Sequence, residues 1–384
     1  MRILLDVSAV PSRPMGAGVY AVNLARHLAT RDDVDLHLAA RRGDGHRWLD
    51  LAPGATVHVT VPDRRPMRLA WEQIGAAALV RRVEPDVWHG IHYTMPLRLD
   101  VPCVVTVHDL TFFEHPEWHE RSKVVFFRPM IRAAVARAAA IVAVSRDTAT
   151  RLDATLAPHA PVVVATHGVD HERFRPGRLD DADDLARLRV HGVRRPYIAF
   201  QGTIEPRKDV PTLVRAFATV ARERPDLRLV IAGRDGWGAE PVRAAIEASG
   251  VATRVLRPGY LPDDTVPALY RQADAVAYPS FEEGFGLPAL ETLACGAPLV
   301  STLGSAIEEV VDDAALLVSP GDPQVLAAAL EAVLSDAALA STFRRAGPAR
   351  AARATWRASA DRHVEAYRLA AEHAPVKAPA GVGA

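Results

Sequence analysis

Short apolar runs alternate with helix-length amphipathic segments along nearly the whole chain, and this alternation limits the possible folds more than any other feature. In the first half, runs of strand length occur at residues 2–7, 34–40, 86–90, 103–109, 140–145 and 161–168. The alternation restarts with runs at 197–202, 227–233, 253–259, 274–280, 298–302 and 315–320. A repeated strand–helix–strand pattern predicts parallel sheets covered by helices on both faces.

A polar, charged stretch at residues 169–195 separates the two series of runs. A chain of 384 residues has enough material for two domains. We therefore expect an α/β protein of two doubly wound, Rossmann-like domains facing each other across a cleft, with residues 1–175 in the first and 176–354 in the second. The helical segment at about 355–373 has apolar side chains all round and could pack back on the first domain. Residues 374–384 are expected to form a flexible tail.

Charge and cysteine content narrow the function classes. The 46 basic residues balance 46 acidic ones, so the positive surplus of a general nucleic-acid binder is missing. Cys103 and Cys295 lie in apolar or small-residue segments, which indicates buried thiols in a reducing compartment. The N-terminus lacks a signal-peptide pattern, and no apolar stretch approaches the length of a membrane span. We expect a cytoplasmic protein, at most held at the inner face of a membrane.

The stretch FEEGFGLPALETLACG, residues 281–296, places Glu283 and Glu291 on either side of a loop that opens into a helix. If the helix begins near Gly286 or Leu287, Glu291 shares a face with apolar side chains, where a carboxylate needs donors nearby. Glu283 then lies in the loop beside the positive end of the helix, a place that suits an anion or a polyol. The structural alternative is that Glu283 caps the helix and Glu291 forms a salt bridge.

The stretch GTIEPRKD, residues 202–209, places Arg207 and Lys208 between the end of a strand and the start of a helix. Ligands of doubly wound sheets bind beyond the carboxyl ends of the strands. The two adjacent cations are therefore a candidate diphosphate clamp, and a solvated charged turn is the alternative.

His108 stands where another buried strand ends, so it could orient a substrate or hydrogen-bond to it near neutral pH. A purely structural hydrogen bond is the alternative. His89 and His92 lie nearby in sequence, but no carboxylate or cysteine in their stretch completes a ligand set. We expect no metal site.

Gly16 and Gly18 belong to a glycine pattern that formally resembles a dinucleotide-binding loop. That loop requires its first glycine directly at the strand end, whereas eight residues separate Val7 from Gly16 here. The pattern favours a glycine loop near a diphosphate or an acceptor over a nicotinamide site.

Residues 121–137 form a candidate basic amphipathic helix without a single acid. The segment is compatible with contact to anionic lipid or to an acidic acceptor, and a solvated helix face is the alternative. Its cations are Arg121, Lys123, Arg128, Arg132 and Arg137. Acceptor recognition is expected in loops of the first domain, at residues 8–20, 60–72 and 90–97.

Taken together, these motifs resemble the retaining nucleotide-sugar glycosyltransferases of family 4, which have the GT-B fold, and most of all a bacterial mannosyltransferase-like branch. The likeness covers residues 1–372. It is most specific at residues 202–209 and 258–302 and at the following GSAIEEV. The first domain adds DVWHGIHYTMP, TVHDLTF, VSRDTATRL and THGVD.

The resemblance implies roles for individual residues. Glu283 would contact the hydroxyls of the donor sugar, and Glu291 would hold the ribose hydroxyls of the nucleotide. Lys208 would bind the donor diphosphate with help from Arg207, and His108 would lie near the donor sugar and the acceptor. The catalytic set is then His108, Glu283, Lys208 and Arg207.

The remaining implied donor contacts come from two glycine-rich loops and the start of the helix in 281–296. Many family members carry an arginine where Thr203 follows Gly202, so more of the phosphate charge would rest on the following cations. These further donor-binding positions are Gly16, Gly18, Gly202, Thr203, Gly284, Phe285, Gly286 and Leu287.

The expected function is metal-independent, retaining transfer of a hexose, with mannose from GDP-mannose as the first choice, and no cofactor beside the donor substrate. The acceptor would be a hydroxyl of a glycan, a lipid-linked molecule or a secondary metabolite. Alternatives are another sugar from a UDP or dTDP donor, such as N-acetylglucosamine, or a nucleotide-sugar epimerase. A sugar-binding protein without activity and an NAD(P)-dependent oxidoreductase are further rivals, weakened by the clustered cations and the misplaced glycines respectively.

Overall fold

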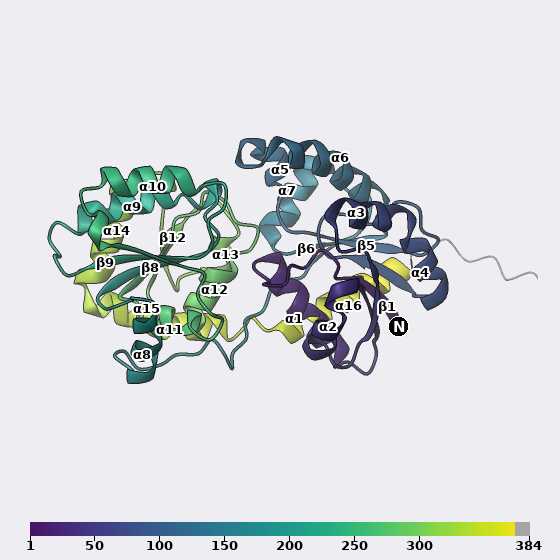
Figure 1. Ribbon diagram of the computed structural model, residues 1–384, viewed down its shortest axis with the longest axis horizontal. Coiled ribbons are helices and arrows are strands. Elements are labelled where there is room, and N and C mark those ends of the chain that lie inside the picture. Colours follow the sequence, from purple (N-terminus) through teal and green to yellow (C-terminus); the bar gives the residue numbers. More distant parts are fainter. Residues whose placement is uncertain (373–384) are drawn as a thin grey trace, which may run out of the picture. The chain divides into compact units, whose positions relative to one another are not determined.

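The computed structural model describes residues 1–372, so the expected tail at 374–384 lies outside the described residues. The chain divides into two compact units, residues 1–167 with the helix that begins at Trp356, and residues 168–355 (Figure 1). The division falls a few residues before the expected boundary at 175. The prediction of two doubly wound α/β domains is confirmed, because each unit contains one fully parallel sheet.

The sheet of the first unit has seven strands in the order β3-β2-β1-β4-β5-β6-β7. These strands are β1 Arg2–Asp6, β2 Asp35–Arg41, β3 Thr56–Val61, β4 Val87–Gly90, β5 Cys103–Val107, β6 Ala140–Ala143 and β7 Val162–Val164. The helices are α1 Ala17–Ala29, α2 Gly45–Leu51, α3 Arg65–Ile74, α4 Ala76–Val83, α5 Thr111–Glu114, α6 Arg121–Arg137, α7 Arg146–Leu156 and α16 Trp356–Glu372.

One edge of this sheet differs from the expectation. Strand β3 has no counterpart among the expected strands, and the stretch 60–72, expected as a loop, contains the end of β3 and most of α3. The sequence TVHVTV of β3 mixes polar and apolar residues because an edge strand is half exposed. It therefore lacks the continuous apolar run by which the buried strands were recognised.

The C-terminal helix α16 packs on the first unit, where it contacts α1, β5, β6 and β7. Two buried polar contacts fix it there. The hydroxyl of Tyr20 lies 2.8 Å from Nε2 of His363, and the hydroxyl of Tyr367 lies 2.8 Å from Nδ1 of His89. Its buried apolar side chains complete the packing, so a segment more than 180 residues beyond β7 belongs to the first core.

The sheet of the second unit has six strands in the order β10-β9-β8-β11-β12-β13. Its strands are β8 Tyr197–Gln201, β9 Arg228–Ala232, β10 Val255–Gly259, β11 Ala275–Tyr278, β12 Leu299–Thr302 and β13 Leu316–Val318. Its helices are α8 Ala182–Val190, α9 Val210–Val220, α10 Ala239–Ala248, α11 Val266–Arg271, α12 Leu287–Ala294, α13 Ile307–Val311, α14 Pro323–Ser335 and α15 Ala337–Ala351. Figure 1 shows α9 and α10 on one face of this sheet and α11 and α12 on the other.

Each sheet reverses its strand order once. In the second unit, β8 and β11 are neighbours, while β8 connects onward to β9 on one side and β11 to β12 on the other. In the first unit, β1 and β4 have the same relation. A crevice opens at the carboxyl ends of two such strands, because their outgoing connections diverge. The loops after β8 and β11, and those after β1 and β4, are thus the places for a ligand.

Within residues 1–372, no single helix is long and apolar enough to cross a membrane. The pair Pro323–Ser335 and Ala337–Glu372 meets the length and composition of a span only together, and it is bent by 93°.

Candidate functional site

The strand ends of the second unit approach one another so closely that they require glycine. Gly233, which follows β9, has φ 131°, and a Cβ atom there would lie 1.9 Å from the carbonyl oxygen of Gly202. The backbone N–H of Gly233 donates to the carbonyl of Gly259. Glycine at the ends of β8, β9 and β10 therefore lets the backbones of these strand ends approach one another closely.

A cluster of charged side chains lies at the switch point between β8 and β11. A short 3₁₀ turn after β8, Pro206–Lys208, supplies Arg207 and Lys208, and the loop after β11 supplies Glu283. Nη1 of Arg207 lies 2.6 Å from Oε2 of Glu283, and Nζ of Lys208 donates to its Oε1 and to the hydroxyl of Tyr278. The hydroxyl of Ser280 also donates to Oε1, at 2.9 Å. The fold thus brings two adjacent cations into contact with a carboxylate 75 and 76 positions further along the chain.

The burial of this cluster shifts the pKa values of its members. Burial alone would raise the pKa of Glu283, but the charges of Arg207 and Lys208 outweigh it and lower that pKa to about 2. Burial and the repulsion of Arg207 lower the pKa of Lys208 to about 8, against the opposing attraction of Glu283 and Glu205. The carboxylate is firmly ionised, whereas the charge of the ammonium is only partly offset by Glu283, because burial and Arg207 disfavour it. A further anion would therefore be stabilised beside Lys208.

The helix that follows this loop is α12, which begins at Leu287 directly after Gly286. The φ of Gly286, 94°, is a left-handed conformation that glycine adopts without strain. No side chain caps this helix, so the alternative role of Glu283 as a cap is wrong. Leu287 and Leu290 are buried beside Glu291, as the expected helical register requires. Phe285 is also buried, so that a ligand beside this turn would meet mainly its backbone.

Glu291 carries a carboxyl group without a partner. Among the described residues, no side chain or backbone group is hydrogen-bonded or ion-paired to this carboxyl, so the alternative of a structural salt bridge is not observed. Burial raises its pKa to about 8, although the charge of Arg173 partly opposes the shift. Among residues 1–372, no group supplies the donors that the sequence analysis required beside Glu291, and the side chain of Glu291 is half-buried.

The raised pKa of Glu291 leads to a testable pH dependence. Between pH 4.5 and about 8 the unfolded chain holds Glu291 ionised while the folded chain holds it protonated, so the contribution of this group to stability falls as the pH rises. We expect Glu291→Gln to exceed the wild type in stability by roughly 2 kcal/mol at pH 8.5, with the gain vanishing near pH 4.5. Urea unfolding at several pH values measures this difference in the free energy of unfolding. Glu247→Gln, at an exposed position on α10, is the control. A gain that does not change with pH contradicts the assignment.

The first unit holds the other predicted residues, Gly16, Gly18 and His108. Gly16 precedes α1 with φ 51°, and a Cβ atom at Gly18 would lie 3.0 Å from Cβ of Pro14. One turn into α1, the ring of Tyr20 meets the ring of His108 edge-on, with 5.2 Å between centroids. The start of α1 and His108 are thus in contact through Tyr20.

The hydrogen bond of His108 fixes its tautomer. Nε2 lies 2.8 Å from the carbonyl oxygen of Ile91, which can only accept, so Nε2 carries the proton. Burial lowers the pKa of His108, which keeps the ring neutral. Nδ1 is then a hydrogen-bond acceptor, and no described residue donates to it.

Glu72, on α3, was not recognised from the sequence. It is 4% exposed, and its two oxygens accept from the hydroxyl of Thr94 and the side-chain amide of Gln73, both at 2.8 Å. Burial, aided by the negative charge of Asp6, raises its pKa to about 7. Glu72 thereby anchors the loop after β4, in which the carbonyl of Ile91 accepts the hydrogen bond from Nε2 of His108. The sequence did not predict this contact, because a single acidic residue in a segment expected to be a loop does not indicate a buried hydrogen bond to Thr94.

His89 belongs to the core of the first unit. His89 bonds Thr106 and Tyr367, each at 2.8 Å, and is fully buried. In the described part of the chain, no group of three His, Cys, Asp or Glu side chains is arranged to hold a metal ion.

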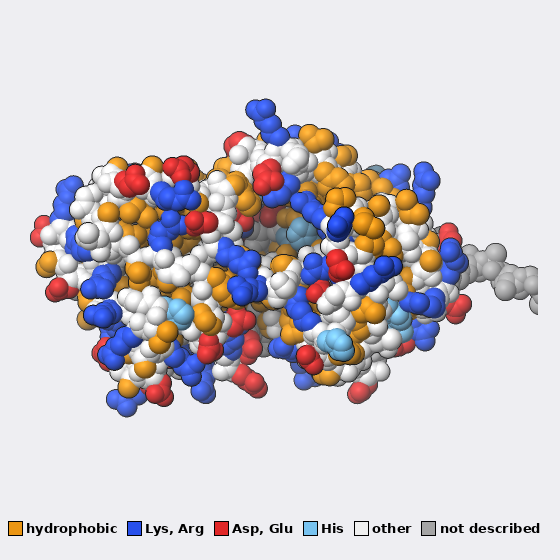
Figure 2. All heavy atoms as spheres, in the orientation of Figure 1, with side chains coloured by type: hydrophobic (Ala, Val, Ile, Leu, Met, Phe, Trp, Pro, Cys, Tyr) orange, Lys and Arg blue, Asp and Glu red, His pale blue; other side chains and the backbone are white. Residues whose placement is uncertain are grey.

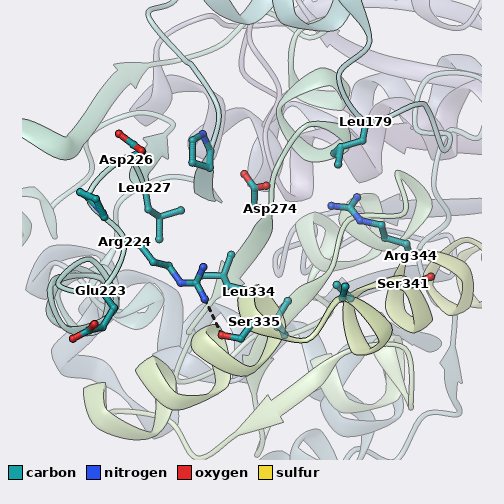
Figure 3. Close-up of a pocket in the computed structure, with 15 residues that line it drawn as sticks. Leu179, Glu223, Arg224, Asp226, Leu227, Asp274, Leu334, Ser335, Ser341 and Arg344 are labelled. Carbon is teal, nitrogen blue, oxygen red and sulfur yellow. Dashed lines mark hydrogen bonds between the residues drawn. The ribbon is translucent and has the colours of Figure 1, made fainter.

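A separate pocket of about 570 Å³ lies at the amino ends of the strands of the second sheet (Figure 3). Its lining includes Pro196, Leu227 and Asp274, which immediately precede β8, β9 and β11. Arg224 in this lining donates to the hydroxyl of Ser335 at 2.7 Å, the contact drawn in Figure 3. Because it lies at the amino ends of the strands, this pocket is distinct from the candidate site.

Two family models match the chain, one on each unit. Residues 14–173 match the model described as glycosyltransferase family 4, and residues 187–350 match the model described as glycosyl transferases group 1. The second match contains Arg207, Lys208, Glu283 and Glu291, and the first contains His108 and both glycines.

Curated relatives of similar sequence are also glycosyltransferases. The chain is 29% identical over 306 residues to O-antigen chain mannosyltransferase B of Escherichia coli, covering 79% of this chain and 78% of that protein. It is 30% identical to D-inositol 3-phosphate glycosyltransferase of Segniliparus rotundus, covering 92% and 84%.

Among solved structures, sucrose-phosphate synthase of Thermosynechococcus elongatus superposes with a TM-score of 0.78 at 21% identity, covering 96% of this chain and 98% of that one. Anabaena HepE in complex with UDP-glucose gives 0.72 at 21% identity, covering 97% and 98%. These likenesses show the two-domain GT-B fold, while the family models and the curated relatives show the family. The chain belongs to the family 4 glycosyltransferases.

Proposed function

We propose that this glycosyltransferase moves a hexose from a nucleoside diphosphate sugar to a hydroxyl acceptor with retention of configuration. The observation that carries the proposal is the buried contact of Arg207 and Lys208 with Glu283 at the switch point of the second sheet. Two cations held beside one carboxylate fit a ligand that combines an anionic diphosphate with the hydroxyls of a sugar.

Each part of the donor has a matching group in the second unit. The diphosphate would lie against Arg207 and Lys208, where added negative charge offsets the desolvation of the ammonium. The sugar hydroxyls would donate to Glu283, which stays ionised at any physiological pH because its pKa is about 2. The ribose hydroxyls would meet the carboxyl group of Glu291, which has no protein donor.

The mechanism follows from where charge develops. As the glycosidic bond breaks, the leaving diphosphate gains negative charge, which Arg207, Lys208 and the start of α12 would stabilise. These cations would take the role that a divalent metal has in other transferases. No side chain of the cluster is placed as a free nucleophile, because both oxygens of Glu283 are engaged by cations. We favour front-face substitution, in which the departing phosphate oxygen takes the proton of the acceptor hydroxyl.

The first unit would contribute a hydrogen-bond acceptor. His108 is neutral with its proton on Nε2, so Nδ1 could accept from a hydroxyl of the donor sugar or of the acceptor. The start of α1 at Gly16 would offer backbone N–H groups to the same ligand.

GDP-mannose remains the first choice of donor, and the similarity to a mannosyltransferase supports it. A UDP donor is the second candidate, because HepE, a protein of the same fold, is seen in complex with UDP-glucose. The acceptor is proposed to be a hydroxyl of a glycan, a lipid-linked molecule or a small metabolite.

A thermal-shift screen of nucleoside diphosphates and their sugars tests the donor. A ligand at ~100 times its dissociation constant should stabilise the fold by ~2.7 kcal/mol, which raises the melting temperature by a few degrees. We expect a guanosine diphosphate to give the largest shift, and its mannose conjugate to be consumed only with an acceptor. A product without the acceptor's added mass would indicate an epimerase, and no shift with any nucleotide contradicts the proposal.

A further inference from the structure

A network of polar side chains in the core of the first unit joins helix α16 to strand β5, beside α1 (Figure 1). At its centre is Thr106 of β5, whose hydroxyl lies 2.8 Å from the hydroxyl of Tyr20 and 2.8 Å from Nε2 of His89. On α16, Nε2 of His363 lies 2.8 Å from the hydroxyl of Tyr20. One turn later, the hydroxyl of Tyr367 lies 2.8 Å from Nδ1 of His89. These five side chains, called here the buried network, have no exposed surface, so the histidines visible in Figure 2 are others.

One end of the buried network sets the direction of its hydrogen bonds. Nδ1 of His363 lies 2.7 Å from the carbonyl oxygen of Ser359, which can only accept, so Nδ1 carries the proton. Burial lowers the pKa of His363 to about 4, so the ring is neutral and its Nε2 accepts from the hydroxyl of Tyr20. The hydroxyl of Tyr20 has a single proton, and its oxygen therefore accepts from the hydroxyl of Thr106.

The other half of the network follows from the first. Because the hydroxyl proton of Thr106 points to Tyr20, Nε2 of His89 must donate to Thr106. Burial lowers the pKa of His89 well below its usual value, so this ring is also neutral, and its Nδ1 accepts from the hydroxyl of Tyr367. Every bond then has one donor and one acceptor, and the order of the protons depends on the carbonyl of Ser359.

Tyr20 connects the buried network to two residues of the candidate site. Its backbone N–H donates to the carbonyl of Gly16 at 3.1 Å, and its ring meets the ring of His108 edge-on, with 5.2 Å between centroids. The hydrogen bond from Nε2 of His108 to Ile91 by itself leaves the His108 ring free to turn about that bond, whereas the ring of Tyr20 packed against it blocks the turn. The direction in which Nδ1 of His108 points therefore depends on where Tyr20 is held.

We propose that His363 is a positioning residue for sugar transfer, which holds Tyr20 and through it orients His108 and the start of α1. The inference rests on the proposed role of His108 in the reaction. His363 accepts the hydroxyl proton of Tyr20 from a position 343 residues further along the chain. Helix α16 thereby does more than cover the first sheet, because its side chains order a part of the candidate site.

Loss of the acceptor at position 363 has a defined structural consequence. With leucine in place of His363, the hydroxyl of Tyr20 is satisfied by donating to Thr106, which must then donate to Nε2 of His89. The proton of His89 moves to Nδ1, which donates to Tyr367, and the whole network reverses. The hydroxyl of Tyr20 is then held from one side alone, and its ring can shift against His108. Glutamine at position 363 supplies a side-chain carbonyl that accepts from Tyr20, so it should keep the original direction.

Imidazole ¹⁵N spectra of the full chain test the proposal without any substrate, since they show which ring nitrogen carries the proton. In the wild type, His89 and His108 should be protonated on Nε2 and His363 on Nδ1. In His363→Leu, the proton of His89 should move to Nδ1 and the ring signals of His108 should shift. In His363→Gln and in Tyr367→Phe, both rings should keep the wild-type pattern. Single His→Gln variants assign the signals.

Steady-state release of GDP from GDP-mannose, with octyl mannoside as the hydroxyl acceptor, gives the second readout. His363→Leu should lower kcat ~10-fold through the misplaced His108 and leave the donor KM within about twofold of the wild type. His363→Gln should recover most of that loss. Tyr367→Phe is the matched control, because it removes a buried hydrogen bond of the same helix but leaves both bonds of Tyr20 in place. His363→Leu and Tyr367→Phe should both melt a few degrees lower, and both are assayed below that temperature.

The two readouts separate positioning from stability. A proton of His89 that stays on Nε2 in His363→Leu contradicts the deduced network and overturns the proposal. Equal losses of kcat in His363→Leu and Tyr367→Phe, with the ring signals of His108 unchanged, also overturn it, since His363 would then act on stability alone. A wild type that does not turn over GDP-mannose, or His108→Gln at the wild-type rate, contradicts the proposed function instead, and the spectra still decide whether His363 orients His108.

Discussion

Alanine in place of Lys208 is expected to lower the rate of sugar transfer ~100-fold or more, because the leaving diphosphate loses a buried cation that acts in the transition state. Nζ of Lys208 lies in a fully buried position against Tyr278 and Glu283, where an electrostatic contact is worth far more than at the surface. The fold should survive, since the remaining Arg207 still pairs with Glu283 at 2.6 Å.

Steady-state kinetics with a nucleotide sugar and an acceptor measure the effect on kcat and KM separately. A loss mainly in kcat indicates stabilisation of the transition state, whereas a loss confined to KM indicates a binding role only. Lys123→Ala is the matched control, because Lys123 lies on α6 in the first unit and pairs with Glu120. Turnover near the wild-type rate in Lys208→Ala would rule out the proposed role of this lysine.

Glutamine in place of Glu283 is expected to destabilise the ligand-free protein by roughly 3 kcal/mol, because it removes the counter-charge that the buried Lys208 shares with the half-buried Arg207. Arg207 cannot lose its proton, and Lys208 can escape the repulsion only by deprotonation. The variant should therefore push the pKa of Lys208 below its present value of about 8. Transfer activity should fall together with stability, since the sugar hydroxyls lose an ionised acceptor.

The pH dependence of this variant has a definite sign. With Glu283 gone, the folded state binds fewer protons at Lys208 than the unfolded state does, so the stability of the variant rises with pH. The penalty relative to the wild type should be largest below the lowered pKa of Lys208, shrink as the pH rises towards about 8, and stay constant above it. Urea unfolding across this range measures it. A penalty that stays the same at every pH would show that the ammonium of Lys208 does not depend on Glu283.

Glu240→Gln is the control for this experiment. Glu240 pairs with Arg243 on the surface, and 79% of its side chain is exposed. Removing its charge should change the free energy of unfolding by less than ~0.5 kcal/mol. A nucleoside diphosphate should restore part of the stability of Glu283→Gln, because it supplies negative charge to the same two cations.

The central cluster illustrates what could be predicted from sequence. Arg207, Lys208 and Glu283 were recognised because each follows an apolar run that ends a parallel strand, and such strand ends share one edge of a sheet. Strand β3 and helix α3 were missed for the opposite reason. Both lie where the polar and apolar pattern is set by partial exposure and by local polar contacts, such as that of Glu72 with Thr94. Neither β3 nor α3 therefore shows the continuous apolar run that identifies a buried strand.

The sequence by itself determined the two parallel sheets, the order of their strands along the chain, and the loops that could hold a donor, because burial of parallel strands requires continuous apolar runs. Only the tertiary structure decided which charged side chains of those loops pair with one another. It places one carboxylate between two cations, leaves the carboxyl group of Glu291 without a protein donor, and fixes the proton of His108 on Nε2. It also links His363 to Tyr20 through a buried hydrogen bond. Each of these depends on contacts between segments far apart in sequence, and their energies come from burial that no local pattern encodes.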